Sequence, residues 1–221
     1  MSLPVTIGVF GASGRMGRAL QDICHQCTQP VIVSSKNWKT DFQKSDVVVD
    51  FSVASAIIEH GTWAVQHKKP YMICVTGLEP EILDSFPRWA CSIPVLHAPN
   101  TSLMITWLTH MLKNWKHVLN ADHDVDIYET HHCAKKDAPS GTAKVFQDIL
   151  NSPVHASRLG HSPGEHSLKW VGRYDQMTIT HQAWDRKLFA QGARKGAQWL
   201  STQPKGLYTM ENVYGFSPLS S

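Results

Sequence analysis

The 221-residue chain has no run of about 18 consecutive apolar residues, which is what a membrane-spanning helix needs. Its first residues, Met1-Ser-Leu-Pro, lead directly into an apolar segment and lack the basic-then-apolar order of a signal peptide. The chain also lacks a cluster of basic residues: 18% of its residues are charged, which is ordinary for a soluble globular protein, and the mild formal net charge of +3 comes from scattered Lys and Arg. We therefore expect a cytoplasmic protein that has neither a membrane nor a nucleic acid as its partner.

Cysteine is sparse and odd in number, with five residues. Cys24 and Cys27 have the spacing of a redox or zinc half-motif, but the sequence has no second pair at that spacing. Both fall late in an expected helix, so we interpret them as small apolar residues. In a reducing cytoplasm all five should remain free thiols.

A glycine-rich turn follows the first apolar segment. Residues 5–10 form a short expected strand, residues 11–17 read Gly-Ala-Ser-Gly-Arg-Met-Gly, and apolar residues at three- and four-residue spacing then predict a helix. Glycines in this context let the backbone approach a pyrophosphate, which rests on the N-terminus of the helix. The spacing is G-x-x-G-x-x-G, and the alternative is an ordinary tight strand-to-helix connection. The strand, turn and helix together favour dinucleotide binding.

The end of the second expected strand, residues 30–34, bears on the choice of cofactor. An acidic residue at this position bonds the ribose 2′-hydroxyl of NADH and repels the 2′-phosphate of NADPH. The sequence instead has Ser34, Ser35 and Lys36, and the next carboxylate is Asp41. Two hydroxyls and an ammonium group suit a phosphate, so the sequence favours NADPH over NADH.

Strands and helices alternate through the first half of the chain. Further apolar strands are expected at residues 47–51, 71–75 and 94–97. Such alternation predicts an α/β fold with a Rossmann-like parallel sheet, on which ligands bind at the carboxyl ends of the strands. The residues expected at those ends, which should line one crevice, are Gly11, Ser34, Ser52, Thr76 and Asn100.

The pattern then changes. Residues 104–118 predict an amphipathic helix, and residues 151–164 predict a loop. Residues 167–171 and 176–181 predict a pair of antiparallel strands. This part of the chain is therefore expected to form a smaller α+β domain with a mixed or antiparallel sheet.

A closing helix over residues 189–200 is expected to return to the first domain. The predicted organisation is a dinucleotide-binding domain over residues 1–102 that is completed by residues 187–221. The second domain is predicted to span residues 103–186.

The most distinctive segment surrounds the histidine pair His131 and His132. If residues 125–132 form a strand, the two imidazoles point to opposite faces. Ser140 is a good N-cap, and a helix is expected over residues 141–150. A helix N-terminus with cationic side chains beside it is a site for a carboxylate or a phosphate. The alternative is a solvated polar loop whose basic residues bind nothing.

The 13 histidines also permit a metal-dependent hydrolase as a hypothesis. His161, His166 and Glu165 could join the histidine pair around an ion. The sequence has no H-E-x-x-H pair, however, and adjacent histidines on a strand cannot readily share one ion. We therefore expect no metal.

Taken in order, these motifs resemble the dihydrodipicolinate reductase (4-hydroxy-tetrahydrodipicolinate reductase) family of bacterial lysine and diaminopimelate synthesis. The resemblance covers nearly the whole chain. Its most specific part is the block Glu-x-His-His-x-x-Lys-x-Asp-Ala-Pro-Ser-Gly-Thr at residues 129–142. The other matching segments are residues 11–17, 50–52, 76–77, 98–102, 164–166, 189–193 and 206–210.

The resemblance implies a hydride transfer from NADPH or NADH to a cyclic imine dicarboxylate, formed by loss of water from 4-hydroxy-tetrahydrodipicolinate, to give tetrahydrodipicolinate. It implies that His131 and Lys135 are the catalytic pair, with Lys135 the proton donor. His132, Gly141 and Thr142 match residues that bind the substrate carboxylates. The smaller domain would bind the substrate and assemble the family's homotetramer.

The cofactor contacts implied by the resemblance lie in the glycine turn and in two later loops. Ser35 and Lys36 join them through the phosphate argument given above. The remaining expected cofactor-binding residues are Gly11, Ala12, Ser13, Gly14, Arg15, Met16, Cys74, Val75, Thr76, Ala98, Pro99, Asn100 and Thr101.

The chain departs from the family at Cys74, where a glycine is usual, and at Asp185, where a small hydroxyl residue is common. The segment between Ser34 and Asp50 is short, so a helix and a strand that are common in the family are trimmed or absent. These departures motivate an alternative, a non-catalytic dinucleotide-binding or redox-sensing protein on the same fold. The intact catalytic pair favours the enzyme.

Overall fold

The computed structural model describes residues 4–33, 36–119 and 122–216, which fold into two units. The first unit contains the described residues of Met1–Thr101 and Phe189–Gly215. The second contains Ser102–Leu188 and Phe216. The chain therefore leaves the first unit after its fifth strand and returns to it through a helix.

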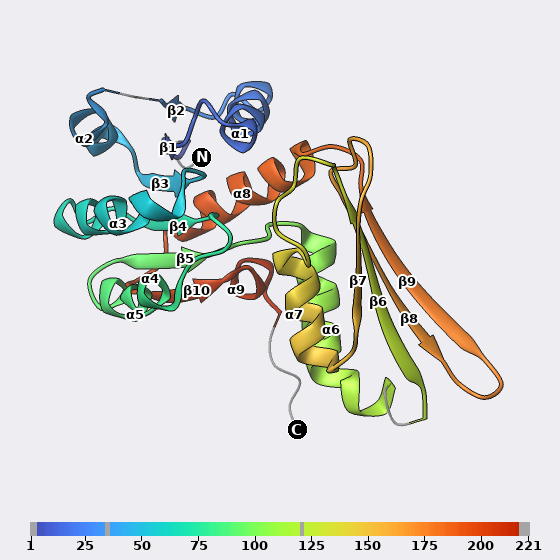
Figure 1. Ribbon diagram of the computed structural model, residues 1–221. Helices are drawn as coiled ribbons and strands as arrows, with labels where there is room; N and C mark the ends of the chain where they lie inside the picture. Colours follow the sequence, from blue (N-terminus) through green and yellow to red (C-terminus); the bar gives the residue numbers. More distant parts are fainter. Residues whose placement is uncertain (1–3, 34–35, 120–121, 217–221) are drawn as a thin grey trace. The chain divides into compact units, whose positions relative to one another are not determined.

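The first unit is built on a six-stranded sheet in the order β10-β5-β4-β3-β1-β2, and each neighbouring pair is parallel (Figure 1). Parallel neighbours need crossover connections, and helices supply them here. The predicted α/β fold with a Rossmann-like sheet is confirmed. The strands are β1 (Ile7–Phe10), β2 (Val31–Ile32), β3 (Val47–Asp50), β4 (Tyr71–Ile73), β5 (Pro94–His97) and β10 (Gly206–Thr209).

Helices cover both faces of this sheet, so its strands are apolar on both sides. Ile7 and Val9 of β1 share one buried cluster with residues of α1 and α8. Val48 of β3 and Tyr71 of β4 share another with residues of α3 and α5. The helices of this unit are α1 (Arg15–Gln26), α2 (Trp38–Asp41), α3 (Ile57–Gln66), α4 (Pro80–Leu83), α5 (Ser85–Ala90), α8 (Lys187–Leu200), which begins in the second unit, and α9 (Met210–Tyr214), with 3-10 turns η1 (Phe42–Lys44) and η2 (Ala54–Ala56).

The short segment between β2 and β3 packs through aromatic rings. Trp38 and Phe42 meet Phe10 edge-on, with ring centroids 5.0 and 4.8 Å apart. Phe10 also stacks on His60 at a centroid distance of 3.7 Å. Aromatic contacts therefore hold this segment against the sheet with only one helical turn and a 3-10 turn.

The second unit is a four-stranded sheet in the order β7-β6-β8-β9. The β6–β7 pair is parallel and the other two pairs are antiparallel, so the predicted mixed sheet is confirmed. Helices α6 (Leu103–Leu119) and α7 (Gly141–Leu150) pack on one face through a buried cluster that includes Leu112, Phe146 and Trp170. The strands are β6 (Asp124–His131), β7 (Val154–Arg158), β8 (Gly164–Val171) and β9 (Gln176–Ala183).

The expectation of a loop over residues 151–164 was wrong in its centre, where β7 lies. The segment Val-His-Ala-Ser-Arg has no regular alternation, because β7 is an edge strand whose side chains are mostly exposed. Its stability comes from the parallel ladder with β6, in which Ile127 faces Val154 and His131 faces Arg158.

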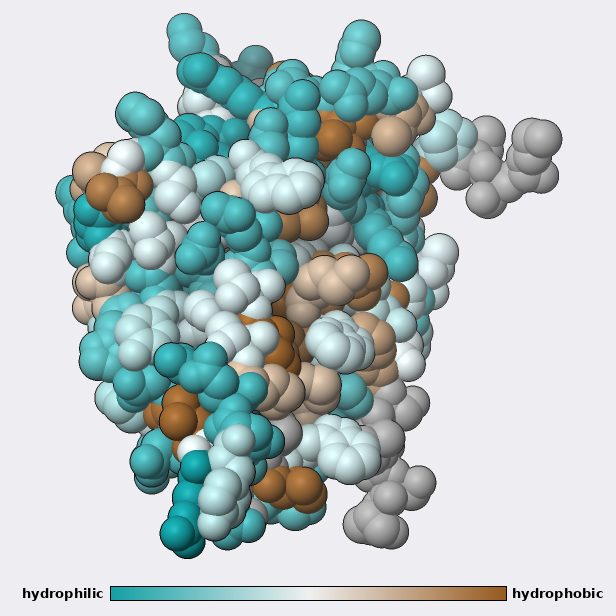
Figure 2. Space-filling model, turned by 90° about the vertical axis from the view of Figure 1, so that its right-hand side faces the viewer, coloured by the Kyte–Doolittle hydropathy of each residue, from teal (hydrophilic) through white to brown (hydrophobic). Residues whose placement is uncertain are grey.

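The face of this sheet opposite α6 and α7 carries no helix in the described part of the chain. Figure 2 views the molecule from this side and shows hydrophilic side chains with hydrophobic ones among them. Tyr128 and Val171 are exposed, and Tyr128 stacks on His155 at 4.8 Å. Across the described residues of both units, the helices are too short or too polar to cross a membrane.

Candidate active site

The glycine turn of the first unit has backbone contacts that side chains would prevent. Gly11 has a φ angle of +71°, and a Cβ atom on it would lie 2.5 Å from the Phe51 carbonyl oxygen. A Cβ atom on Gly17 would lie 2.3 Å from the Gly11 carbonyl oxygen. Helix α1 starts after Gly14 with no side-chain cap and no acidic residue in its first turn. The first turn of this helix therefore supplies no carboxylate of its own to compete with an anion.

The other expected cofactor residues follow β4 and β5. Cys74, Val75 and Thr76 come directly after β4, and residues 98–101 come directly after β5. Because β1, β4 and β5 belong to one parallel sheet, these loops and the glycine turn lie along the same edge of the sheet. Lys36 is exposed, whereas Ser35 lies outside the described residues.

Some of these residues are buried or already occupied. Val75, Ala98 and Thr101 are buried, and the Thr101 hydroxyl donates to the Phe189 carbonyl oxygen at 2.7 Å. Burial and, secondarily, the charge of Asp50 raise the pKa of the Cys74 thiol well above its ordinary value. Because thiolates are the reactive form of cysteine, this environment makes Cys74 a poor nucleophile.

Asp50, at the end of β3, is a residue whose role sequence reasoning missed. Its carboxylate has no exposed surface and accepts hydrogen bonds from the Ser52 amide (2.8 Å) and the Ser52 hydroxyl (2.5 Å). It also contacts His60 Nδ1 and the Tyr71 hydroxyl, each at 2.7 Å. The network fixes the turn after β3, on which Gly11 packs. An aspartate at the end of an apolar strand was the available signal.

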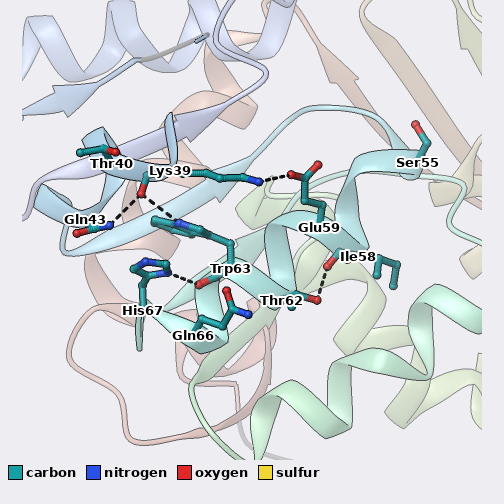
Figure 3. A pocket seen from close by; sticks show the side chains of 10 residues that line it. All are labelled: Lys39, Thr40, Gln43, Ser55, Ile58, Glu59, Thr62, Trp63, Gln66 and His67. Atoms are coloured by element: carbon teal, nitrogen blue, oxygen red, sulfur yellow. Dashed lines mark hydrogen bonds and ion pairs between the residues drawn. The ribbon is translucent and has the colours of Figure 1, made fainter. Parts of the chain in front are cut away.

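A surface pocket of about 620 Å³ lies between the α2–η1 segment and α3 (Figure 3). Two of the side chains that line it, Lys39 and Glu59, form an ion pair in which Nζ lies 2.8 Å from the carboxylate oxygen. The Trp63 indole N–H donates to the Lys39 carbonyl oxygen at 3.2 Å. None of the residues expected to bind cofactor or substrate lines this pocket.

In the second unit, β6 places Glu129 and His131 on the helix-covered face, as strand alternation predicts. Glu129 accepts a hydrogen bond from His131 Nδ1, one from Arg158 Nη2 at 3.0 Å and one from the Ser140 amide at 3.2 Å. Burial opposes the ionised form of Glu129, but these donors, Arg158 foremost, hold its pKa below the ordinary value.

The His131 ring lies in a closed setting. Burial lowers its pKa below the ordinary histidine value, although the neighbouring Glu129 carboxylate partly opposes this shift. Its Nε2 atom faces Gly164: a Cβ atom built on that glycine would lie 2.9 Å from Nε2. The His166 ring meets it edge-on at 5.1 Å.

The predicted N-cap and helix are observed. The Ser140 hydroxyl oxygen accepts from the Ala143 amide at 3.2 Å, and α7 begins at Gly141. The hydroxyl also contacts His166 Nε2 at 3.1 Å. Gly141 is exposed, and a Cβ atom on it would meet nothing within 4 Å. The first turn of α7 is therefore open to a small ligand.

The remaining expected residues lie around this helix start. Lys135 Nζ pairs with the Asp137 carboxylate at 2.8 Å, and its own amide donates to the His132 carbonyl oxygen at 3.0 Å. His132 and Thr142 are partly exposed.

Arg158 was given no role from the sequence, because its segment was expected to be a loop. In the structure it lies on the edge strand β7 and donates to the Glu129 carboxylate.

Among the described residues, Glu129, His131 and His166 form a group whose ligand atoms lie within 4.8 Å of one another. Such a group could in principle hold a metal ion. The Glu129 carboxylate, however, already accepts from Arg158, whose fixed positive charge lies 3.0 Å away. A second cation in the same place would be repelled, so the geometry favours a hydrogen-bond network.

A parallel sheet with a glycine turn between its first strand and first helix is typical of dinucleotide-binding oxidoreductases. Family models described as dihydrodipicolinate reductase, N-terminus and C-terminus, match residues 5–101 and 105–214. The chain belongs to the dihydrodipicolinate reductase family.

Individual relatives agree with this assignment. The chain is 34% identical to the 4-hydroxy-tetrahydrodipicolinate reductase of Zymomonas mobilis, over 96% of this chain and 97% of that protein. It is 30% identical to the enzyme of that name from Rickettsia rickettsii, over 95% of this chain and 99% of that protein.

Solved structures agree in fold. Dipicolinate-bound dihydrodipicolinate reductase from Paenisporosarcina sp. TG-14 superimposes with a TM-score of 0.72 at 20% identity, over 95% of this chain and 99% of that chain. A probable dehydrogenase from Thermotoga maritima gives 0.61 at 9% identity, over 95% of this chain and 92% of that chain.

The buried His166 generates a prediction about pH. Burial, with the neighbouring His131 as a smaller cause, lowers the pKa of His166 from 6.5 to about 3. Because this folded-state pKa is depressed, the ring stabilises the fold above pH 6.5 and loses that contribution as the pH falls toward 3. Between pH 7.5 and pH 5 the loss should be about 2 kcal/mol, at about 1.4 kcal/mol per pH unit below the unfolded pKa.

Urea unfolding followed by tryptophan fluorescence at both pH values measures this loss. His166→Gln should remove about 2 kcal/mol of the pH dependence, whatever its stability at pH 7.5. The exposed His161, changed to Gln, is the control and should keep the wild-type dependence. Equal pH dependence in wild type and His166→Gln would contradict the assignment.

Proposed function

We propose that this protein is a 4-hydroxy-tetrahydrodipicolinate reductase. Family membership makes it an NAD(P)H-dependent oxidoreductase of lysine and diaminopimelate biosynthesis. Its substrate would be the cyclic imine dicarboxylate derived from 4-hydroxy-tetrahydrodipicolinate, and its product tetrahydrodipicolinate. The observation that carries the proposal is the buried Glu129–His131 pair beside the open N-terminus of α7.

The first unit would be the dinucleotide-binding domain. The close approaches at Gly11 and Gly17 and the uncapped start of α1 fit a pyrophosphate resting on a helix N-terminus. When bound, NAD(P)H supplies the hydride. The glycine turn and the loops after β4 and β5 would bind and orient it, and Ala98 and Val75, being buried, would do so through their backbone.

The second unit would be the substrate-binding domain. Hydride addition leaves electron density on the substrate ring, and a proton from Lys135 Nζ would meet it. The backbone N–H groups at Gly141 and Thr142, in the first turn of α7, suit one substrate carboxylate, and His132 suits the other. His131 would present Nε2 to the ring as a hydrogen-bonding partner.

The alternative of a redox-sensing protein on the same fold rested on Cys74. A thiol whose pKa is raised by burial and by Asp50 is poorly suited to sensing oxidants. We therefore favour a catalytically active reductase over a non-catalytic dinucleotide-binding protein.

Assembly and location are further parts of the proposal. The proposed form is a homotetramer in the cytoplasm. The uncovered face of the β7-β6-β8-β9 sheet, with Tyr128 and Val171 exposed on it, supports self-association. Light scattering on the purified protein would give four times the chain mass of 24.7 kDa. A monomer mass at micromolar concentration would contradict this part.

The activity itself is tested by following nicotinamide absorbance while the precursor is generated enzymatically in the assay. Substrate-dependent oxidation of NADPH or NADH is expected. Oxidation of neither would refute the proposed function.

Lys135→Ala should lower kcat by about 10²- to 10⁴-fold, which is the usual contribution of a general acid. Cofactor affinity, measured by fluorescence, should stay within about twofold, since Lys135 lies outside the glycine turn. The control is Lys136→Ala, at the exposed neighbouring position, which should behave as wild type. A Lys135→Ala rate near wild type would show that another group donates the proton.

Preference for NADPH is proposed from the exposed Lys36 and the lack of an acidic residue there. Lys36→Glu should weaken NADPH binding by about tenfold or more, since a reversed charge costs about 1.4 kcal/mol or more beside a phosphate. NADH binding, which involves no 2′-phosphate, should change little. Lys44→Glu, an exposed charge reversal nearby in sequence, is the control. Equal weakening of both cofactors by Lys36→Glu would remove Lys36 from the phosphate site.

A further inference from the structure

The Glu129 side chain has no exposed surface, and its charge must be compensated inside the protein. Its three donors come from three segments: His131 on the same strand, Arg158 on β7 and the amide of Ser140 before α7. Each donor occupies a lone pair that water would otherwise satisfy. The carboxylate therefore joins the strand, the edge strand and the helix start.

An ionised carboxylate can only accept hydrogen bonds. The His131 Nδ1 atom beside Glu129 must therefore carry a hydrogen, and the neutral ring then has its lone pair on Nε2. This is the atom that faces Gly164, where no side chain intervenes. Glu129 thus determines which nitrogen of His131 is left to accept a proton or a hydrogen bond.

Arg158 connects this pair to the lysine. Its Nη2 atom also donates to the carbonyl oxygen of Asp137, whose carboxylate pairs with Lys135 Nζ at 2.8 Å. The β6–β7 ladder brings Arg158 opposite His131, so backbone pairing sets its place. The Arg158 guanidinium therefore contacts both Glu129, which binds His131, and Asp137, which pairs with Lys135.

We propose that Glu129 and Arg158 are positioning residues for the reductase reaction, fixing His131 in the Nδ1-protonated form and tying it to the Lys135 loop. The proposal rests on the proposed function, in which His131 and Lys135 meet the substrate. Neither positioning residue is required to touch the substrate.

The first measurement is the tautomer of His131, read from ¹⁵N NMR of histidine-labelled protein at pH 7.5. The wild type should show Nδ1 protonated. Glu129→Gln replaces the acceptor oxygen with an amide that can donate to Nδ1, so the ring should shift toward the Nε2-protonated form. This readout needs no turnover, so it separates failure of this proposal from failure of the proposed function.

The second measurement is steady-state kinetics. Glu129→Gln should lower kcat by about 100-fold or more with the substrate KM within about threefold, because the change misplaces the proton and leaves the helix start open. Glu129→Asp, which keeps the carboxylate, should retain the wild-type tautomer. Its kcat should be at least about tenfold higher than that of Glu129→Gln. Arg158→Lys, which keeps the charge but loses the fork, should lower kcat by about tenfold.

Glu165→Gln is the matched control, because Glu165 lies on β8 across from Thr130, on the opposite face of the sheet from Glu129. It should leave both the tautomer and kcat unchanged. If Glu129→Gln does not fold, Glu129→Asp and Arg158→Lys are read by the same two measurements.

Two results would overturn the proposal. One is an unchanged His131 tautomer together with kcat within threefold of wild type in Glu129→Gln. The other is a raised KM at constant kcat in Arg158→Lys, which would make Arg158 a substrate-binding residue instead.

Discussion

A carboxylate removed from water has to be surrounded by donors, since leaving it unpaired costs several kcal/mol. In the part of the chain that the structure describes, a strand of each sheet carries such a carboxylate, Asp50 in the first unit and Glu129 in the second. Asp50 fixes the turn on which the glycine loop packs, and Glu129 fixes His131 and the start of α7. The same electrostatic requirement therefore orders the backbone proposed to bind the cofactor and the side chains proposed to do the chemistry.

Features determined by neighbouring residues were predicted from the sequence. The apolar strands, the glycine turn and the Ser140 cap each depend on local propensity, and each is present. The partners of the two carboxylates were not predicted, because they depend on packing between distant segments. Tyr71 is 21 residues from Asp50, and Arg158 is 29 residues from Glu129. Arg158 also lies on β7, an edge strand that is stabilised by its ladder with β6. The sequence of β7 has no alternating apolar pattern, so this strand could not be predicted from periodicity.

The structure also changes the expected electrostatics of the helix start. The sequence suggested cationic side chains beside it, yet Lys135 is paired with Asp137 and Arg158 with Glu129. Burial lowers the pKa values of His131 and His166, so both rings are neutral at pH 7. A carboxylate bound here would be held largely by neutral donors aimed at it, namely amide N–H groups and hydroxyls, with the helix dipole behind them.

The Arg158–Glu129 and Lys135–Asp137 ion pairs differ in exposure, and the difference fits the roles proposed for His131 and Lys135. The Glu129 side chain is fully buried and that of Arg158 is 19% exposed, so the pair is shielded from water and from competing ions. The Lys135–Asp137 pair is 21% and 47% exposed, and pairs of that kind contribute only about 0–1 kcal/mol. If a dicarboxylate binds at α7 as proposed, one carboxylate can meet the neutral donors of the helix start while the other competes for the Lys135 ammonium at little cost, and the buried pair keeps His131 in place. The site would thus combine a fixed support with a lysine, the proposed proton donor, whose exposed ion pair can exchange partners.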